Sequence, residues 1–172
     1  ADIVDFLKID PSKIEVLYQS ISPKYFKDPK NEELLSKYNL PEQFILAVGT
    51  IEQRKNQLTI LKAIHDSKID THVVFVGQPT SYAASILTFI TENKMEDRVK
   101  FLKNIPRKEL AALYRRASMS VYLSIFEGFG LPVIESMACG CPVITSNVSC
   151  LPETAGDAAL LCDPEDSNEL AE

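Results

Sequence analysis

The sequence predicts an α/β domain with a doubly wound, Rossmann-like parallel sheet and helices on both faces. Short apolar runs rich in β-branched residues alternate with longer segments whose apolar residues recur every three or four positions. This alternation is typical of βαβ units. The chain has 172 residues, of which 45% are apolar and 24% charged, so one packed domain is expected and intrinsic disorder is excluded.

The predicted elements follow from these two periodicities. Residues 1–43 are expected to form a lead-in segment, least regular over 20–43 because of its three prolines, and residues 44–172 the Rossmann-like core. Leu61 and Leu113 lie in helical stripes and should face the core. Strands are predicted at 14–18, 44–48, 72–76, 99–102, 120–123, 142–145 and 158–161, and helices at 31–38, 56–67, 81–93, 107–117, 131–138 and from about 165.

Composition and charge argue against nucleic acid, a membrane span and zinc as partners of the chain. The formal net charge of -6 would repel a nucleic acid backbone, so nucleic acid is not expected as a partner. No apolar run approaches the roughly 20 residues that cross a bilayer, and no signal peptide is apparent, which favours a cytoplasmic protein. The cysteines at 139, 141, 150 and 162 lack the C-x-x-C spacing of a zinc site and are expected to be free thiols.

Ligands of a doubly wound sheet bind beyond the carboxyl ends of its strands, and the densest signal there is SIFEGFGLPVIE, residues 124–135. Pro132 favours a helix start near Leu131. The free amides of that start form an anion site, which Gly128 and Gly130 let a phosphate approach closely. Glu135, one turn into the helix, would reach a ribose diol. The alternative interpretation is a favourable acid in a first helical turn.

A second segment, VGTIEQRKN at residues 48–56, also joins a strand to a helix through a glycine turn. Arg54 and Lys55 lie just before the helix, where cations are unfavourable to its dipole unless an anion is bound between them. This placement favours an anion site. The alternative is a pair of surface charges in a loop, just as Glu127 alone would be a solvated loop charge.

The segment VYLSIFEGFGLPVIESMACGCPVITSNVSCLPETAGDAALLCDP, residues 121–164, resembles the donor-site signature of the large retaining glycosyltransferase family with the GT-B fold. It has the E-x7-E spacing between Glu127 and Glu135. The segments VGTIEQRKNQLTILKAI and VKFLKNIPRKELAALYRRA fit the same family in order, as does KIEVLYQSIS. Two positions depart from the pattern: Thr50 stands where many members have arginine, and Lys103 where they often have glycine.

This resemblance implies a role for each matching residue. Glu135 would hold the ribose, Glu127 and the amides of residues 128–131 the sugar and diphosphate, and Lys55 with Arg54 would neutralise the diphosphate without a metal or other cofactor. Independently of the resemblance, Phe129 is expected to fill the core, with capping of the sugar site as the alternative. The expected donor site is completed by Gly49, Thr50, Lys103, Asn104 and Ile105, the last three through backbone contacts to the base.

The resemblance implies a hexosyltransferase of polysaccharide or glycolipid synthesis. We expect the full enzyme to be cytoplasmic, with a peripheral position at the cytoplasmic membrane face as the alternative. We expect the chain to be its nucleotide-sugar-binding half, with the N-terminal acceptor domain and the C-terminal end outside it, and therefore inactive alone. Two other functions compete with this interpretation. A dinucleotide-dependent oxidoreductase is disfavoured because G-x-G-x-x-G is absent after residue 48. A degenerate, noncatalytic module that docks a partner remains the alternative.

Overall fold

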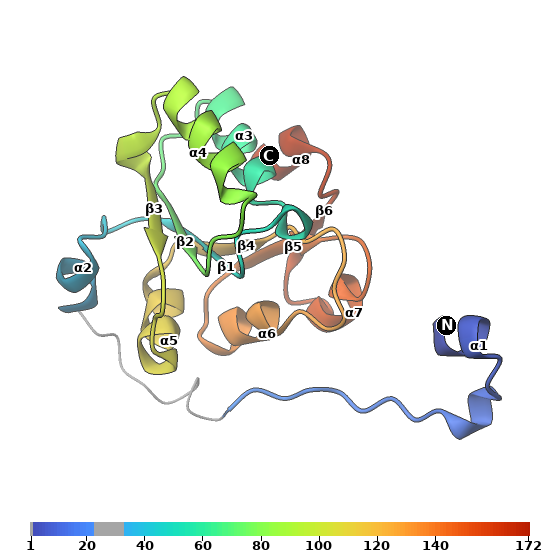
Figure 1. Cartoon of the computed structure of the whole chain (residues 1–172). Helices are drawn as coiled ribbons and strands as arrows, with labels where there is room; N and C mark the ends of the chain where they lie inside the picture. Colours follow the sequence, from blue (N-terminus) through green and yellow to red (C-terminus); the bar gives the residue numbers. More distant parts are fainter. Residues whose placement is uncertain (1, 23–32) are drawn as a thin grey trace.

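A computed structural model of the chain describes residues 2–22 and 33–172, and it contains the predicted doubly wound sheet (Figure 1). All neighbouring strands run parallel, in the order β3-β2-β1-β4-β5-β6. The strands are β1 Ile45–Val48, β2 Val73–Val76, β3 Val99–Leu102, β4 Met119–Tyr122, β5 Val143–Ser146 and β6 Leu160–Cys162. The Rossmann-like fold predicted from the sequence is therefore confirmed.

Helices cover both faces of this sheet. In Figure 1, the upper face carries α3 Gln57–Asp66, α4 Ala83–Glu92 and α8 Ser167–Ala171. The lower face carries α2 Glu33–Tyr38, α5 Arg107–Arg116, α6 Leu131–Ala138 and α7 Leu151–Ala155. Three short 3-10 turns complete the described elements: η1 Pro11–Lys13, η3 Gln53–Lys55 and η4 Glu96–Arg98.

Two hydrophobic layers hold the helices to the sheet, and β2 shows how one strand serves both. Val73 and Phe75 point to the cluster under α3 and α4, whereas Val74 and Val76 point to the cluster over α2 and α5. This alternation follows from the two-residue repeat of a strand. Because both faces are covered, all four residues are buried and the strand is apolar throughout.

The turn after β2 depends on a glycine. A Cβ atom at Gly77 would lie 1.9 Å from the carbonyl oxygen of Gly49, so any side chain there would force the two turns apart. The amide of Gly77 donates to Leu102 in β3 and that of Gly49 to Val76 in β2. The turns after β1 and β2 are thus packed backbone to backbone at the edge where ligands are expected.

The lead-in segment differs from the prediction. Residues 14–18 were predicted to be a strand but are not, because no strand of the described sheet lies beside them to complete a hydrogen-bond ladder. They run as extended chain below α6 and α7 in Figure 1, with Val16 and Leu17 69% and 81% exposed. Helix α1 Asp2–Leu7 was not predicted from the sequence. The predicted helix at 31–38 is present as α2, although its first two residues, like Pro23 and Pro29, lie outside the described residues.

Membrane-spanning helices were searched for in the described part of the chain. Over residues 2–22 and 33–172, none of the helices combines the length and apolar character that a bilayer crossing requires.

Candidate functional site

The candidate site lies where the strand order reverses. β1 is flanked by β2 on one side and β4 on the other, so the crossovers on its two sides lead to opposite faces, and this topology predicts a ligand crevice at the carboxyl ends of β1 and β4. The two sequence segments singled out above, residues 48–56 and 124–135, follow these two strands directly. The topology therefore brings them together.

Three side-chain groups converge on one oxygen atom in this crevice, Oε1 of Glu127. The Lys55 ammonium lies 2.5 Å from it and the Arg54 guanidinium 2.7 Å. The hydroxyl of Tyr122 donates to the same atom over 2.9 Å. The predicted residues Lys55, Arg54 and Glu127 thus form one cluster, assembled across the two segments.

This cluster is largely withdrawn from solvent. The side chains of Lys55 and Glu127 are 12% and 10% exposed, against 43% for Arg54. Burial is the largest influence on the pKa of Glu127 and acts to raise it, but hydrogen bonds from Lys55, Ser124 and Tyr122 together outweigh burial, and the pKa of Glu127 falls below its ordinary value. Glu127 is therefore a carboxylate at neutral pH, held by two cations.

Local backbone geometry sets the two cations in place. Arg54 and Lys55 end the turn η3, and Asn56 then adopts a left-handed conformation with φ of 56° before α3 begins. The aliphatic stem of Lys55 lies over Gly49, where an added Cβ would meet the Lys55 Cε atom at 3.4 Å. Arg54 also ties the segments together: its carbonyl accepts from the amide of Ile125.

A third segment, residues 149–154, fixes the backbone of the glycine loop. The Ser149 hydroxyl accepts from the Glu127 amide at 3.1 Å and donates to the Glu127 carbonyl at 2.8 Å, so it holds both polar groups of that residue. The Cys150 thiol contacts the same carbonyl at 3.2 Å. The hydroxyl of Thr154 donates to the carbonyl of Phe129. Residues after β5 therefore support the loop that follows β4.

Gly130 marks the start of α6. Its φ is 94°, in a region that residues with a side chain rarely adopt. A Cβ atom there would lie 2.6 Å from Cδ2 of Leu151 in α7. Pro132 is the second residue of the helix, as predicted. Because α6 follows β4 through this loop, its amino end lies at the same edge of the sheet as Glu127.

Glu135 lies on α6 one turn from its start. The hydroxyl of Tyr114, a fully buried residue of α5, donates to its Oε2 atom over 3.3 Å. The carboxylate of Glu135 thus lies between two helices on the lower face of the sheet, half-buried. Its contact with a ribose stays a prediction.

The remaining predicted residues lie around this centre. Thr50 follows Gly49, and its carbonyl accepts from Gln57 at 2.8 Å. Lys103, Asn104 and Ile105 follow β3, two strands away from β1 at the same sheet edge. Asn104 accepts a 2.5 Å hydrogen bond from Gln78, which joins the loops after β2 and β3. Their contact with a base is likewise untested.

Phe129 was expected in the core or over the sugar site. It is half-buried and belongs to none of the three core clusters described. Its ring instead faces that of Tyr18 in the lead-in segment, with centroids 6.4 Å apart. Tyr18 also donates a 2.6 Å hydrogen bond to Glu153 of α7. The core interpretation of Phe129 is therefore not supported.

Two residues of the site were missed by the sequence reasoning. Tyr122 reads as one more apolar residue of a buried strand, and Ser149 as a polar loop residue. Only the placement of Tyr122 near the end of the predicted strand 120–123, next to the predicted ligand site, offered a signal. Nothing in the local sequence pairs Ser149 with Glu127.

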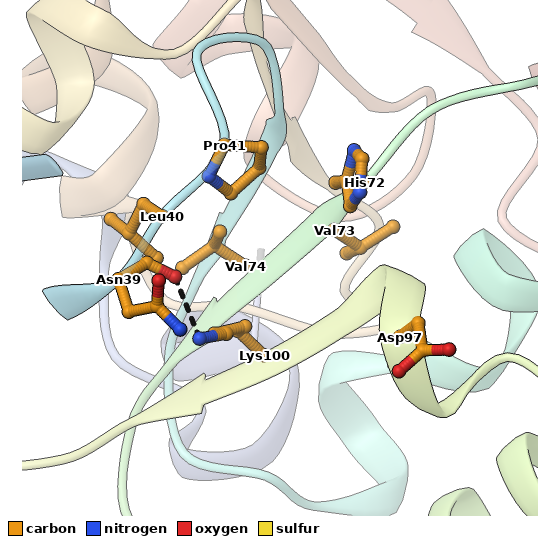
Figure 2. A pocket seen from close by; sticks show the side chains of 8 residues that line it. All are labelled: Asn39, Leu40, Pro41, His72, Val73, Val74, Asp97 and Lys100. Carbon is orange, nitrogen blue, oxygen red and sulfur yellow. Dashed lines mark hydrogen bonds between the residues drawn. The ribbon is translucent and has the colours of Figure 1, made fainter. Parts of the chain in front are cut away.

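A second hollow lies at the opposite edge of the sheet. Figure 2 shows its lining, which comes from the amino ends of β1 to β3, including Pro41, His72 and Asp97. The Lys100 ammonium is occupied there by the carbonyl of Asn39 at 2.6 Å. Because this hollow lies far from the crevice of β1 and β4, we do not assign it to the candidate site. Among the residues described, no group of three His, Cys, Asp or Glu side chains is placed to hold a metal.

A doubly wound parallel sheet with helices on both faces, and with a cation pair beside its switch point, defines the class: a Rossmann-like α/β domain. Comparison with known families is consistent with this class. Residues 30–172 match the family described as glycosyl transferases group 1, and the chain belongs to that family.

Individual proteins that resemble the chain are also glycosyltransferases by name. The chain is 36% identical over 143 residues to O-antigen chain mannosyltransferase B of Escherichia coli, covering 80% of the chain and 38% of the relative. It is 33% identical over 158 residues to O-antigen chain mannosyltransferase RfbU of Salmonella typhimurium, covering 92% and 42%. Among solved structures, sucrose-phosphate synthase of Thermosynechococcus elongatus matches with a TM-score of 0.74 and 33% identity, covering 86% and 39%. The chain thus spans about 40% of the length of the curated relatives it matches.

Proposed function

We propose that this chain is the donor-binding half of a retaining, metal-independent glycosyltransferase and binds a nucleoside-diphosphate sugar at the carboxyl ends of β1 and β4. The observation that carries the proposal is the convergence of Lys55 and Arg54 on Glu127. Arg54 also pairs with Glu52 at 2.8 Å, so in the free chain two carboxylates face the two cations. In the proposed complex, a diphosphate accepts hydrogen bonds from both cations and from the start of α6, in competition with these carboxylates.

Each group has a role in this proposal. Lys55 and Arg54 stabilise the negative charge that develops on the departing diphosphate, and the amides at the start of α6 add to it. Glu127 turns part of its hydrogen-bonding capacity to hydroxyls of the transferred sugar. Glu135 accepts hydrogen bonds from the ribose. No cofactor is required, because these fixed charges replace a metal ion.

The relatives narrow the reaction. Two are named mannosyltransferases of O-antigen chains and one a sucrose-phosphate synthase, so we propose transfer of a hexose in polysaccharide or glycolipid synthesis. Retention of configuration rests on the resemblance of residues 121–164 to the retaining family. The acceptor would be held by an N-terminal domain outside this chain, and water is excluded only when two such halves close. We therefore propose that the chain binds donor without transferring sugar, on the cytoplasmic side of the membrane.

Thermal unfolding with added nucleotides tests the proposal. A ligand at about 100 times its dissociation constant adds about 2.7 kcal/mol to stability. At roughly 2–4 °C per kcal/mol for a domain of this size, the midpoint should rise by about 5–11 °C. Nucleoside diphosphates should act more strongly than monophosphates, and Lys55→Ala should remove most of that difference.

Two outcomes count against the proposal. If a chelator abolishes the shift, metal independence is wrong. If neither nucleoside diphosphates nor nucleotide sugars shift the midpoint at millimolar concentration, a noncatalytic docking module becomes the better interpretation. Repeating the measurement on a longer chain that includes the N-terminal half separates that interpretation from a donor site that needs both halves.

A further inference from the structure

Tyr122 occupies a position that the donor-site roles above do not use. Its hydroxyl accepts a hydrogen bond from the Lys55 ammonium at 2.6 Å and donates one to Glu127 at 2.9 Å. The Lys55 ammonium also lies 4.8 Å from the centre of the Tyr122 ring, within the range of a cation–π contact. The Tyr122 side chain therefore contacts two of the three charged groups of the cluster, Lys55 and Glu127.

The ring of Tyr122 is anchored. The residue is 5% exposed and packs in the cluster of Val133, Val143 and Leu151, and it ends β4, which pairs with β1 and β5. Burial, and after it the neighbouring charge of Glu127, raises the pKa of Tyr122, so the phenol keeps its proton. The hydroxyl is consequently a neutral group at a fixed point.

When the donor binds, the Lys55 ammonium needs a fixed hydrogen-bond acceptor to hold its position. An ammonium has three N–H donors, and Tyr122 and Glu127 take two of them, which leaves one for a phosphate oxygen. In the proposed complex, Glu127 also turns to sugar hydroxyls, so its hold on Lys55 weakens. The contact with Tyr122 does not involve the sugar and stays available throughout.

We propose that Tyr122 is a positioning residue that holds the Lys55 ammonium toward the diphosphate of the donor. This inference rests on the proposed function, since it concerns the same site. Tyr122 itself is not expected to contact the nucleotide. It acts through Lys55, and its contribution should vanish when Lys55 is removed.

A double-mutant cycle tests this role, with UDP and GDP as probes and calorimetric titration of the whole chain as the measurement. Tyr122→Phe keeps the ring and removes the hydroxyl. It should weaken binding of the tighter-binding nucleotide by about tenfold, the lower range for a hydrogen bond to a charged group. In the Lys55→Ala background, the same change should alter affinity by less than about twofold. A purely structural role of Tyr122 would weaken binding equally in both backgrounds.

The chain offers a matched control in Tyr38. Its hydroxyl also donates to a carboxylate, Glu109, at 2.5 Å, and its ring also lies under a lysine, Lys37, at 5.1 Å, but it belongs to α2. Tyr38→Phe should leave nucleotide affinity unchanged. If Tyr122→Phe lowers the melting midpoint, the cycle is run well below that midpoint, where all four proteins are folded.

The outcomes separate this inference from the function on which it rests. If the wild-type chain binds UDP or GDP and Tyr122→Phe matches it within about twofold, the positioning role is wrong while donor binding stands. The positioning role is also wrong if Tyr122→Phe weakens nucleotide binding as much in the Lys55→Ala background as in the wild type. If the wild-type chain binds neither nucleotide, the proposed function fails and takes the inference with it.

Discussion

The Lys55 ammonium lies 2.5 Å from the carboxylate of Glu127, although 72 positions separate the two residues in the chain. Because β1 and β4 are neighbours in the sheet, the turns that follow them meet. Charges that look like ordinary surface residues in either segment thereby form one buried pair.

This pair predicts how stability depends on pH. A carboxyl whose pKa is lowered in the folded protein stabilises it above its unfolded pKa, about 4.3 for Glu, and loses that contribution as pH falls further. The pKa of Glu127 is lowered, so the unfolding free energy of the wild type should drop more steeply below about pH 4.3 than that of Glu127→Gln. Urea unfolding from pH 7 to pH 2.5 measures both. Parallel curves would contradict the charged pair.

Glu135 and Leu61 separate ligand binding from folding. Glu135→Ala should weaken nucleotide binding by about 1.5–3 kcal/mol, as expected for hydrogen bonds to a charged group, and should lower stability by only about 1 kcal/mol through loss of the hydrogen bond from Tyr114. Leu61 is fully buried in α3, and Leu61→Ala should cost roughly 2–5 kcal/mol of folding stability. Titration calorimetry and urea unfolding of both variants check this. The roles are reversed if Glu135→Ala unfolds the domain and leaves affinity intact.

Gly130 and Gly128, two residues apart, should respond differently to alanine. At Gly130 the φ of 94° and the 2.6 Å approach of Leu151 leave no room for a Cβ, so Gly130→Ala should destabilise the fold by about 1–3 kcal/mol. At Gly128 an added Cβ meets nothing within 4 Å. Gly128→Ala should change the unfolding free energy by less than about 0.5 kcal/mol. Equal effects in denaturant unfolding would mean that the start of α6 is misplaced.

Ser149 tests the support of the glycine loop. Its hydroxyl bonds the Glu127 amide and carbonyl, while its own backbone has a φ of 61°. Ser149→Ala loses the hydrogen bonds and should cost about 1–3 kcal/mol of stability. Ser149→Gly loses the same bonds but relieves the left-handed backbone by about 1 kcal/mol, so it should be the more stable variant. If Ser149→Ala is as stable as the wild type in urea unfolding, the hydroxyl contributes little, and the opposite order of the two variants would contradict the left-handed backbone at Ser149.

Most strands of the fold could be predicted from the sequence. Strands β1 to β6 were each predicted within two residues at either end, because buried parallel strands are continuous apolar runs between helical periods. The prediction failed at residues 14–18. Their apolar content resembles that of a strand, but a strand needs a hydrogen-bonded neighbour, which local composition does not reveal.

The sequence by itself determined the two segments that flank the crevice, since the glycines, Pro132 and the charges of Arg54, Lys55 and Glu127 act through local backbone rules. Only the tertiary structure decided which oxygen these cations share, that the Tyr122 hydroxyl contacts both Lys55 and Glu127, and that Ser149 holds the loop. The physical reason is the distance along the chain between the residues that interact. Helix starts and turns depend on residues a few positions apart, whereas these contacts depend on strand order, which brings together residues that the chain keeps far apart.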